Sequence, residues 1–382
     1  PVNLGLNLPV KKKESIAILP FVPFSQDPAD EYFADGMVEE LLNLLAKIPD
    51  LQVAARTSSF AYKNVSNKTI VDIGKELGVD TILEGSIRKN DVTNKIRVRA
   101  QLINVSSGEQ LWSETFDREY RDIFQIQDDI ASAVVNKMKI TLLGNNEQSS
   151  FVAQTLSVDA MVAYGKGKQE LVHRTAPALN KALAHFKQAI REDENYARAY
   201  VGIADANILL ALYSNTSKSV AKEQAQAALD KALSLNSNLG EAYASLGLLW
   251  SVADVNKAVQ YFKQAMELTP NYAMTYMWYG SLLKEQGELT QSHQLFKRAL
   301  ELDPKSPVAA FNVAAGHYEI GNDEKAMELF SQIIANDPYY PSAYNLVGDI
   351  LTNRGRLDEA ITMYMRALDV DSINQHALKG LL

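Results

Sequence analysis

Few residues of this chain stand at spacings that support catalysis or metal binding. Its five histidines show no HExxH pair or other ligand spacing, which argues against a metal site. The absence of cysteine excludes disulfides, thiolate zinc sites and thiol catalysis. No GxSxG motif occurs, and Asp128 and Asp129 are adjacent, so on a helix they point in different directions. We therefore expect no catalytic residue, no metal and no cofactor, and a chain that is not an enzyme.

One short polar segment has the composition of an anion site. Arg56-Thr57-Ser58-Ser59 follows a predicted strand and opens a predicted helix, where free amides and an arginine suit an anion. The same residues are typical of an ordinary helix N-cap beside a surface arginine, and this is the preferred interpretation. Gly165-Lys166-Gly167-Lys168 resembles half of a phosphate loop. Because it lies inside a predicted helix and follows no strand, we interpret it as helix packing.

A repeat in the second half of the chain predicts a larger binding surface. Pro270, Pro304 and Pro338 recur at an interval of 34 residues, each after a similar frame. Small and aromatic residues recur on one helical face in six units, as in Ala258, Phe262 and Ala265. This interval is the signature of tetratricopeptide (TPR) repeats, a family of helix pairs that this half resembles. We expect an all-α solenoid of about six repeats over 158–382, with 373–382 starting a further helix.

The first helix of each predicted unit leaves one face free to line a groove. Aromatic side chains beside asparagines on this face would suit an extended peptide or a protein. The aromatic residues could instead form the core between repeats, and the sequence leaves both readings open. Arrays that hold a carboxyl terminus need Lys and Asn at set places, which here hold other residues, so such a ligand is not expected. In the fourth to sixth units the predicted groove carries Met277, Trp278, Ser281, Phe311, Asn312, Ala315, Asn345 and Asp349.

The residues before the array predict an α/β domain with a mixed sheet over 15–142, in the order β-α-β-α-β-β-β-α. Alternating polar residues place Glu84 opposite Arg99 and Ser86 opposite Arg97. Helices should cover one face of the sheet while the other is solvated. Residues 1–14 and 143–157 are predicted linkers. The expected strands are 16–21, 51–55, 81–88, 95–104 and 110–116, and the main helices are 32–48, 69–77 and 122–140.

This first domain also resembles a known family. The stretches that carry the resemblance are Ser15-Ile16-Ala17-Ile18-Leu19-Pro20-Phe21, Tyr32-Phe33-Ala34-Asp35-Gly36, Ala55-Arg56-Thr57-Ser58-Ser59-Phe60, Leu83-Glu84-Gly85-Ser86-Ile87-Arg88 and Asp122-Ile123-Phe124-Gln125-Ile126-Gln127-Asp128. Together they resemble the TolB-like (FlgO-like) domain that precedes TPR repeats in bacterial signalling proteins. The resemblance implies the sensory region of a membrane-anchored protein, beside a CadC-type DNA-binding domain or a class III adenylate cyclase domain. Neither of those domains is present in these residues.

Composition narrows the partners of the chain. Its 382 residues are 47% hydrophobic and carry a net charge of −8, which argues against direct contact with nucleic acid. No run of 18 apolar residues occurs, and the sequence starts at Pro1, so we expect an upstream membrane anchor. We expect a non-enzymatic sensory region that binds a peptide or protein, compatible with a homodimer, on the periplasmic side of the inner membrane. The alternatives are a periplasmic assembly scaffold without a sensing role and, for location, the cytoplasm.

Overall fold

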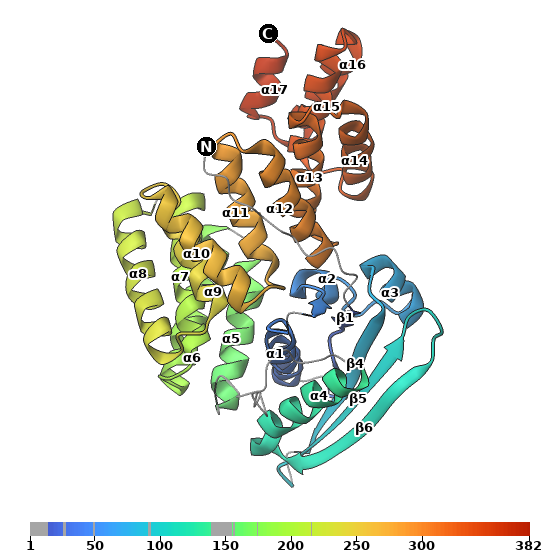
Figure 1. Cartoon of the computed structure of the whole chain (residues 1–382), viewed down its shortest axis with the longest axis vertical. Helices are drawn as coiled ribbons and strands as arrows, with labels where there is room; N and C mark the ends of the chain where they lie inside the picture. The colour runs from blue at the N-terminus through green and yellow to red at the C-terminus, as the bar shows by residue number, and fades with distance from the viewer. Residues whose placement is uncertain are drawn as a thin grey trace.

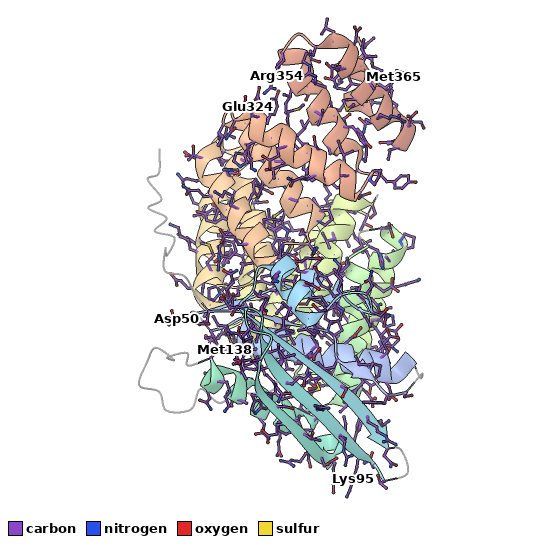
Figure 2. All side chains as sticks on the ribbon, turned by 90° about the vertical axis from the view of Figure 1, so that its right-hand side faces the viewer. Asp50, Lys95, Met138, Glu324, Arg354 and Met365 are labelled. Carbon is purple, nitrogen blue, oxygen red and sulfur yellow. The ribbon has the colours of Figure 1, made fainter. Side chains whose placement is uncertain are left out.

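The computed structural model describes residues 14–138, 155 and 157–382, except 26–27, 49, 91–92, 174 and 215. An α/β part is followed by an array of paired helices (Figure 1). Lys95 lies at one end of the elongated molecule, and Arg354 and Met365 lie at the other (Figure 2). None of the described helices has both the length and the apolar character needed to cross a membrane.

The α/β part contains the predicted mixed sheet, with strand order β3-β1-β4-β5-β6 and β2 also paired to β4. Strands β1, β2 and β3 run parallel to their neighbours, while β4, β5 and β6 are antiparallel. The two-residue β2 was not predicted. The strands are β1 (Glu14–Ile18), β2 (Val22–Pro23), β3 (Leu51–Val53), β4 (Thr81–Asn90), β5 (Lys95–Asn104) and β6 (Gln110–Glu119). The helices are α1 (Pro28–Leu45), α2 (Arg56–Phe60), α3 (Ile70–Leu77), the 3-10 turn η1 (Tyr120–Asp122) and α4 (Ile123–Lys137).

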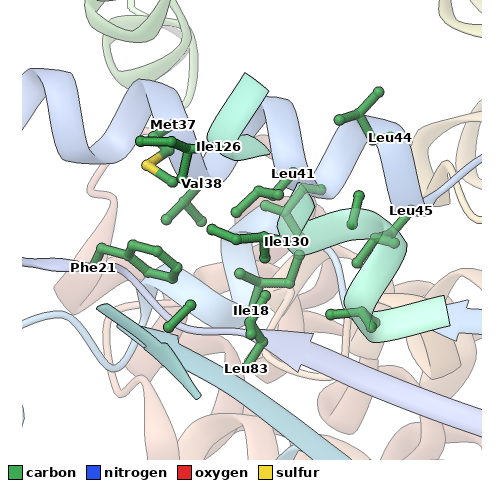
Figure 3. Close-up of a cluster of buried hydrophobic side chains, with 14 of the residues drawn as sticks. Ile18, Phe21, Met37, Val38, Leu41, Leu44, Leu45, Leu83, Ile126 and Ile130 are labelled. Carbon is green, nitrogen blue, oxygen red and sulfur yellow. The ribbon is translucent and has the colours of Figure 1, made fainter. Parts of the chain in front are cut away.

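Helices α1 and α4 cover one face of the sheet and form the main core with it (Figure 3). On β5 the apolar residues are buried on this face, while Lys95, Arg97 and Arg99 are exposed on the other. Around β1 and the start of β4 the second face is also covered, because Ile73 and Leu77 of α3 join a separate buried cluster there. The prediction of one solvated face therefore holds for β5 and β6 and is wrong for the parallel end of the sheet.

The predicted register between β4 and β5 is wrong by two residues. Glu84 lies opposite Gln101, and Ser86 lies opposite Arg99. Side chains repeat every two residues along a strand, so a shift of two keeps every residue on its face and the polarity pattern cannot detect it. On β6, Trp112 packs against the main core while Leu111 is exposed.

The described part of the array, 157–382 without 174 and 215, forms six helix pairs and one further helix. In four of the six pairs a glycine of the first helix faces an aromatic ring of the second: a methyl group built on Gly247 would lie 2.5 Å from the Phe262 ring. Gly167 meets Phe186 in the same way, which confirms that the Gly165–Lys168 segment serves helix packing. The pairs are α5 (Val158–Leu171) with α6 (Ala176–Glu192), α7 (Ala197–Tyr213) with α8 (Lys218–Leu235), α9 (Gly240–Trp250) with α10 (Val255–Leu268), α11 (Ala273–Glu285) with α12 (Leu289–Leu302), α13 (Pro307–Glu319) with α14 (Asp323–Asn336) and α15 (Pro341–Asn353) with α16 (Leu357–Val370), followed by α17 (Gln375–Gly380).

Candidate functional site

The first helix of each unit has an inner face, by which we mean the face that the second helix of the same unit leaves free. In the first unit this face is covered by α1 of the α/β part (Figure 1). The two helices approach closely, since a methyl group built on Gly165 of α5 would lie 3.7 Å from the Cα of Gly36 of α1. Met161 of α5 is fully buried and belongs to the core of the α/β part. The array therefore holds a helix of its own chain.

Buried charges surround this contact. Glu40 of α1 accepts a 2.6 Å hydrogen bond from the hydroxyl of Tyr196, which precedes α7. Arg198 of α7 is 2% exposed and pairs with Glu241 of α9 at 2.9 Å. Burial raises the pKa of Glu40, while the charge of Arg198 and the bond from Tyr196 act in the opposite direction. Buried ion pairs are weak sources of stability and costly to break, so this interface depends on all its partners.

Asn271, in the turn before α11, joins the end of α1 to the array. Its side-chain amide donates to the carbonyl oxygens of Ala46, Ile48 and Leu51, at 2.6 Å for Leu51. Asn271 is 4% exposed, so these bonds lie away from solvent. The fourth unit is thus hydrogen-bonded to the backbone of the segment that follows α1.

Helix α2 of the α/β part contacts the array at the turn between α12 and α13. The Ser58 hydroxyl donates to the Asp303 carboxylate at 2.5 Å and accepts from the backbone amide of Lys305 at 2.9 Å. The amide of Ala55 donates to the carbonyl of Leu302 at 2.7 Å. Burial raises the pKa of Asp303, and hydrogen bonds from Ser58 and Thr57 oppose that rise. The contact fixes the α/β part against the turn between the fourth and fifth units.

These contacts correct both interpretations of Arg56, Thr57, Ser58 and Ser59. The N-cap of α2 is Ala55, without a side-chain cap, and Ser58 and Ser59 are buried. Arg56 is no surface residue, because it pairs with Glu39 at 2.8 Å and its side chain is 18% exposed. The helix start does bind an anion, but that anion is the carboxylate of Asp303 from the same chain. No sequence signal links the two segments, since they are brought together only by folding.

The residues of the predicted groove fall into two groups, one packed in the core of the array and one beside an open hollow. Met277 and Ala315 are 8% and 2% exposed and belong to the core between helices, so neither lines a groove. Trp278 is half-buried against the same core and meets the Tyr272 ring edge-on, with ring centroids 6.5 Å apart. Ser281 is exposed, and its hydroxyl donates to the carbonyl of Met277.

Phe311 and Asn345 border an open hollow of about 490 Å³ between α13, α15 and the segment leading into α17. Phe311 is half-buried, 5.4 Å from the Tyr340 ring. Asn345 is buried and donates to Asn374, the N-cap of α17, at 3.0 Å. Asn312, half-buried on α13, donates to the carbonyl of Val308 one turn before it. The hollow is lined by Phe311, Ser342, Asn345, Leu346, Asp371, Ile373, Asn374, Gln375 and His376.

Side-chain bridges link the first helices of neighbouring units beside this hollow. Asp349 of α15 bonds His376 of α17 at 2.9 Å and accepts from Tyr364 at 2.8 Å, so its carboxylate is already engaged. Lys284 of α11 pairs with Glu319 of α13 at 2.6 Å.

Asn353 of α15 forms the next bridge, by donating to Tyr318 of α13 at 2.9 Å. The residues of these two bridges were not predicted as site residues: Lys284, Glu319, Tyr318 and Asn353. Their signal was present, since each pair is one repeat plus one residue apart.

Comparison with known proteins supports the repeat assignment. Family models described as tetratricopeptide repeat match residues 248–307, 283–350 and 341–374. A Rhizobium meliloti (strain 1021) protein assigned by name as an adenylate cyclase is 34% identical over 206 residues, which are 53% of this chain and 35% of that protein. The transcriptional regulator HilA of Salmonella typhimurium is 24% identical over 289 residues, which are 74% of this chain and 50% of that protein.

The chain thus spans half or less of the length of these curated relatives. Among solved structures it is similar to YrrB, titled a TPR protein with an unusual peptide-binding site, at 23% identity and a TM-score of 0.39 over 51% of this chain and 97% of that one. PilW, a type IV pilus biogenesis factor, aligns at 17% identity and a TM-score of 0.45 over 58% and 99%. Residues 248–374, which span α10 to α16, are therefore tetratricopeptide repeats, and the helix pairs before them continue the same array.

Proposed function

We propose that this chain is a non-enzymatic, protein-binding sensory region of a bacterial signalling protein, and that the inner face of its last three repeat units binds an extended peptide segment. The observation that carries the proposal is the unequal use of the inner face. In the first unit it is filled by α1, whereas between α13 and α15 it holds the open hollow beside Phe311. A single array therefore contains one occupied and one accessible stretch.

The chemistry of the accessible stretch suits a peptide. Phe311 offers a partly exposed aromatic ring, and Val308, one turn earlier on α13, is 36% exposed. Ser342 is exposed at the start of α15 and can bond a peptide backbone. Aromatic anchors surrounded by polar groups are the usual composition of such binding sites.

The wider setting belongs to the same proposal. We assign the α/β part to the TolB-like domains, on the five sequence stretches given above. Relatives named as an adenylate cyclase and a transcriptional regulator support a role in signalling or regulation. In this proposal the region lies on the periplasmic side of the inner membrane in a longer, membrane-anchored protein. Binding in the groove would alter how the α/β part sits on the array and thereby change the output.

The groove is tested with random peptides displayed on phage and selected on the immobilised chain. Peptides that bind should lose affinity by about tenfold or more to the variants Val308→Glu and Ser342→Arg, because both place a large charge beside Phe311. Val252→Glu is the matched control, since Val252 is 93% exposed in the turn between α9 and α10. It should bind as the unchanged chain does.

Two results would contradict the proposal. Peptides that keep their affinity for both groove variants bind elsewhere. Equal losses in the groove variants and in the Val252 control would show a charge effect without a defined site. Thermal unfolding of each variant verifies that the substitution leaves the array folded.

A further inference from the structure

The two edges of the sheet differ in length and in protection. At one edge β3 is three residues long, and its neighbourhood packs against α12 through Gln52 and Arg298. At the other edge β6 runs for ten residues, and no described strand pairs with its outer side (Figure 1). A long open edge exposes backbone donors and acceptors that favour pairing with another strand.

Charged side chains on the core-facing side of β6 would normally discourage such pairing. Phe116 points into the core opposite Val98 and is 3% exposed. Glu114 and Arg118 flank it on the same side, opposite Ala100 and Ile96, and both are exposed. Glu114 has no hydrogen bond or ion pair with any described residue, and Arg118 donates only to the carbonyl of Asp117, at 3.2 Å. The two opposite charges thus stand two residues on either side of Phe116.

This symmetry decides which strand fits the edge. When β6 meets β6 of a second copy in antiparallel orientation with Phe116 opposite Phe116, every Glu114 lies opposite Arg118 of the second copy. Residues opposite each other in an antiparallel pair lie on the same side of the sheet and close enough to form an ion pair. The exposed charges that oppose pairing with an unrelated strand become two ion pairs in a pairing with itself.

We propose that β6 is a homodimer interface, through which two copies of this chain join their sheets into one continuous antiparallel sheet. The contact is two-fold symmetric, so each copy offers the same segment and the assembly closes at two. In the same register Thr115 lies opposite Asp117 of the second copy, which places a hydroxyl beside a carboxylate. The other charged strands of the sheet are internal, so no other described strand offers this pattern.

The first test exchanges the two charges. Analytical ultracentrifugation should give twice the mass of 42.3 kDa for the unchanged chain. Glu114→Arg and Arg118→Glu should each weaken self-association by about tenfold, because each places like charges opposite one another twice in the dimer. The double variant E114R/R118E restores opposite pairs and should dimerise as the unchanged chain does. Val252→Arg, in the exposed turn between α9 and α10 and away from the sheet, is the control for added charge.

The second test reads the register directly, since the chain contains no cysteine. Thr115→Cys and Asp117→Cys should form a disulfide between chains when the two variants are mixed, and neither should do so alone.

A monomer at every attainable concentration would overturn the proposal. So would a dimer that both single charge variants leave unchanged, or a double variant that stays monomeric. Equal cross-linking of each cysteine variant with itself would show a different register.

Discussion

Ser58 in the α/β part donates a 2.5 Å hydrogen bond to Asp303 in the repeat array, across 245 residues of sequence. The same hydroxyl accepts the amide of Lys305, so one serine satisfies two polar groups of the array. With the Asn271 and Glu40 contacts, this bond makes the α/β part an occupant of the array rather than a separate neighbour. Because α1 covers the inner face of the first unit, the surface that remains open to other partners lies in the later units.

Removing the Ser58 hydroxyl should destabilise the folded chain by about 1–3 kcal/mol, because the buried Asp303 carboxylate loses a donor. The measurement is the free energy of unfolding of Ser58→Ala from denaturant titration. Ser113→Ala, on the exposed face of β6, should change it little. Equal effects of the two substitutions would refute the importance of this bond.

Asp205 should contribute a fall in the stability of the folded chain as the pH rises from 4 to 6, opposed by His293, whose pKa is lowered to about 4 by burial. Asp205 of α7 is buried, and burial raises its pKa from 3.8 to about 6, with Glu241 adding to the rise and the Ser245 hydroxyl and Lys168 opposing it. The unfolded chain loses this proton first, so ionisation costs the folded state about 3 kcal/mol by pH 7.

Asp205→Asn keeps an acceptor for Ser245 without the charge. Relative to the unchanged chain, it should lose the Asp205 contribution to the pH dependence and be more stable at pH 7. Asp369→Asn, an exposed carboxylate, is the control. An unchanged pH dependence in Asp205→Asn would show that other groups cause the slope.

Two glycine-to-alanine substitutions should act in opposite directions. A methyl group at Gly247 meets the Phe262 ring at 2.5 Å, so Gly247→Ala should cost about 1–3 kcal/mol through overpacking. At Gly165 the nearest atom would lie 3.7 Å away, an ordinary contact, and Gly165→Ala should stabilise its helix by up to about 1 kcal/mol. Thermal melts of the two variants compare them, and equal melting temperatures would contradict the packing described here.

Trp278→Ala should lower the free energy of unfolding by about 2 kcal/mol, because the half-buried ring packs on the core of α11 and α12 and on Tyr272. Val252→Ala serves as the control, since that side chain is exposed. The sequence alone did not decide whether Trp278 lines the groove or belongs to the core. Loss of peptide binding without loss of stability would place it in the groove.

The repeat array could be predicted from the sequence because its period is enforced by packing. Every 34 residues the same small and aromatic positions must meet, as Phe262 and Phe296 do, so the pattern is visible without a structure. The faces of the strands could also be predicted, because burial alternates with every residue along a strand such as β5. The register of β4 and β5 did not follow, because polarity repeats every two residues and the shift left no trace.

The docking of the two parts could not be predicted. Glu39, Glu40 and Arg198 have the composition of solvated helix faces, yet each is buried because another part of the chain covers it. Ser58 looked like a cap because its true partner lies far along the sequence. Of the residues predicted for the groove, Met277 is buried in the core, while Phe311 lines the hollow.

The seating of the α/β part on the array is tested most directly by zero-length carbodiimide cross-linking of the whole chain, read by mass spectrometry. Lys305 of the array lies 3.0 Å from Glu76 of α3, and Lys284 and Glu319 within the array lie 2.6 Å apart. The account predicts that both pairs become linked within single chains, at a yield independent of concentration. A Lys284–Glu319 link without a Glu76–Lys305 link would contradict it, because the array would then be folded with the α/β part detached.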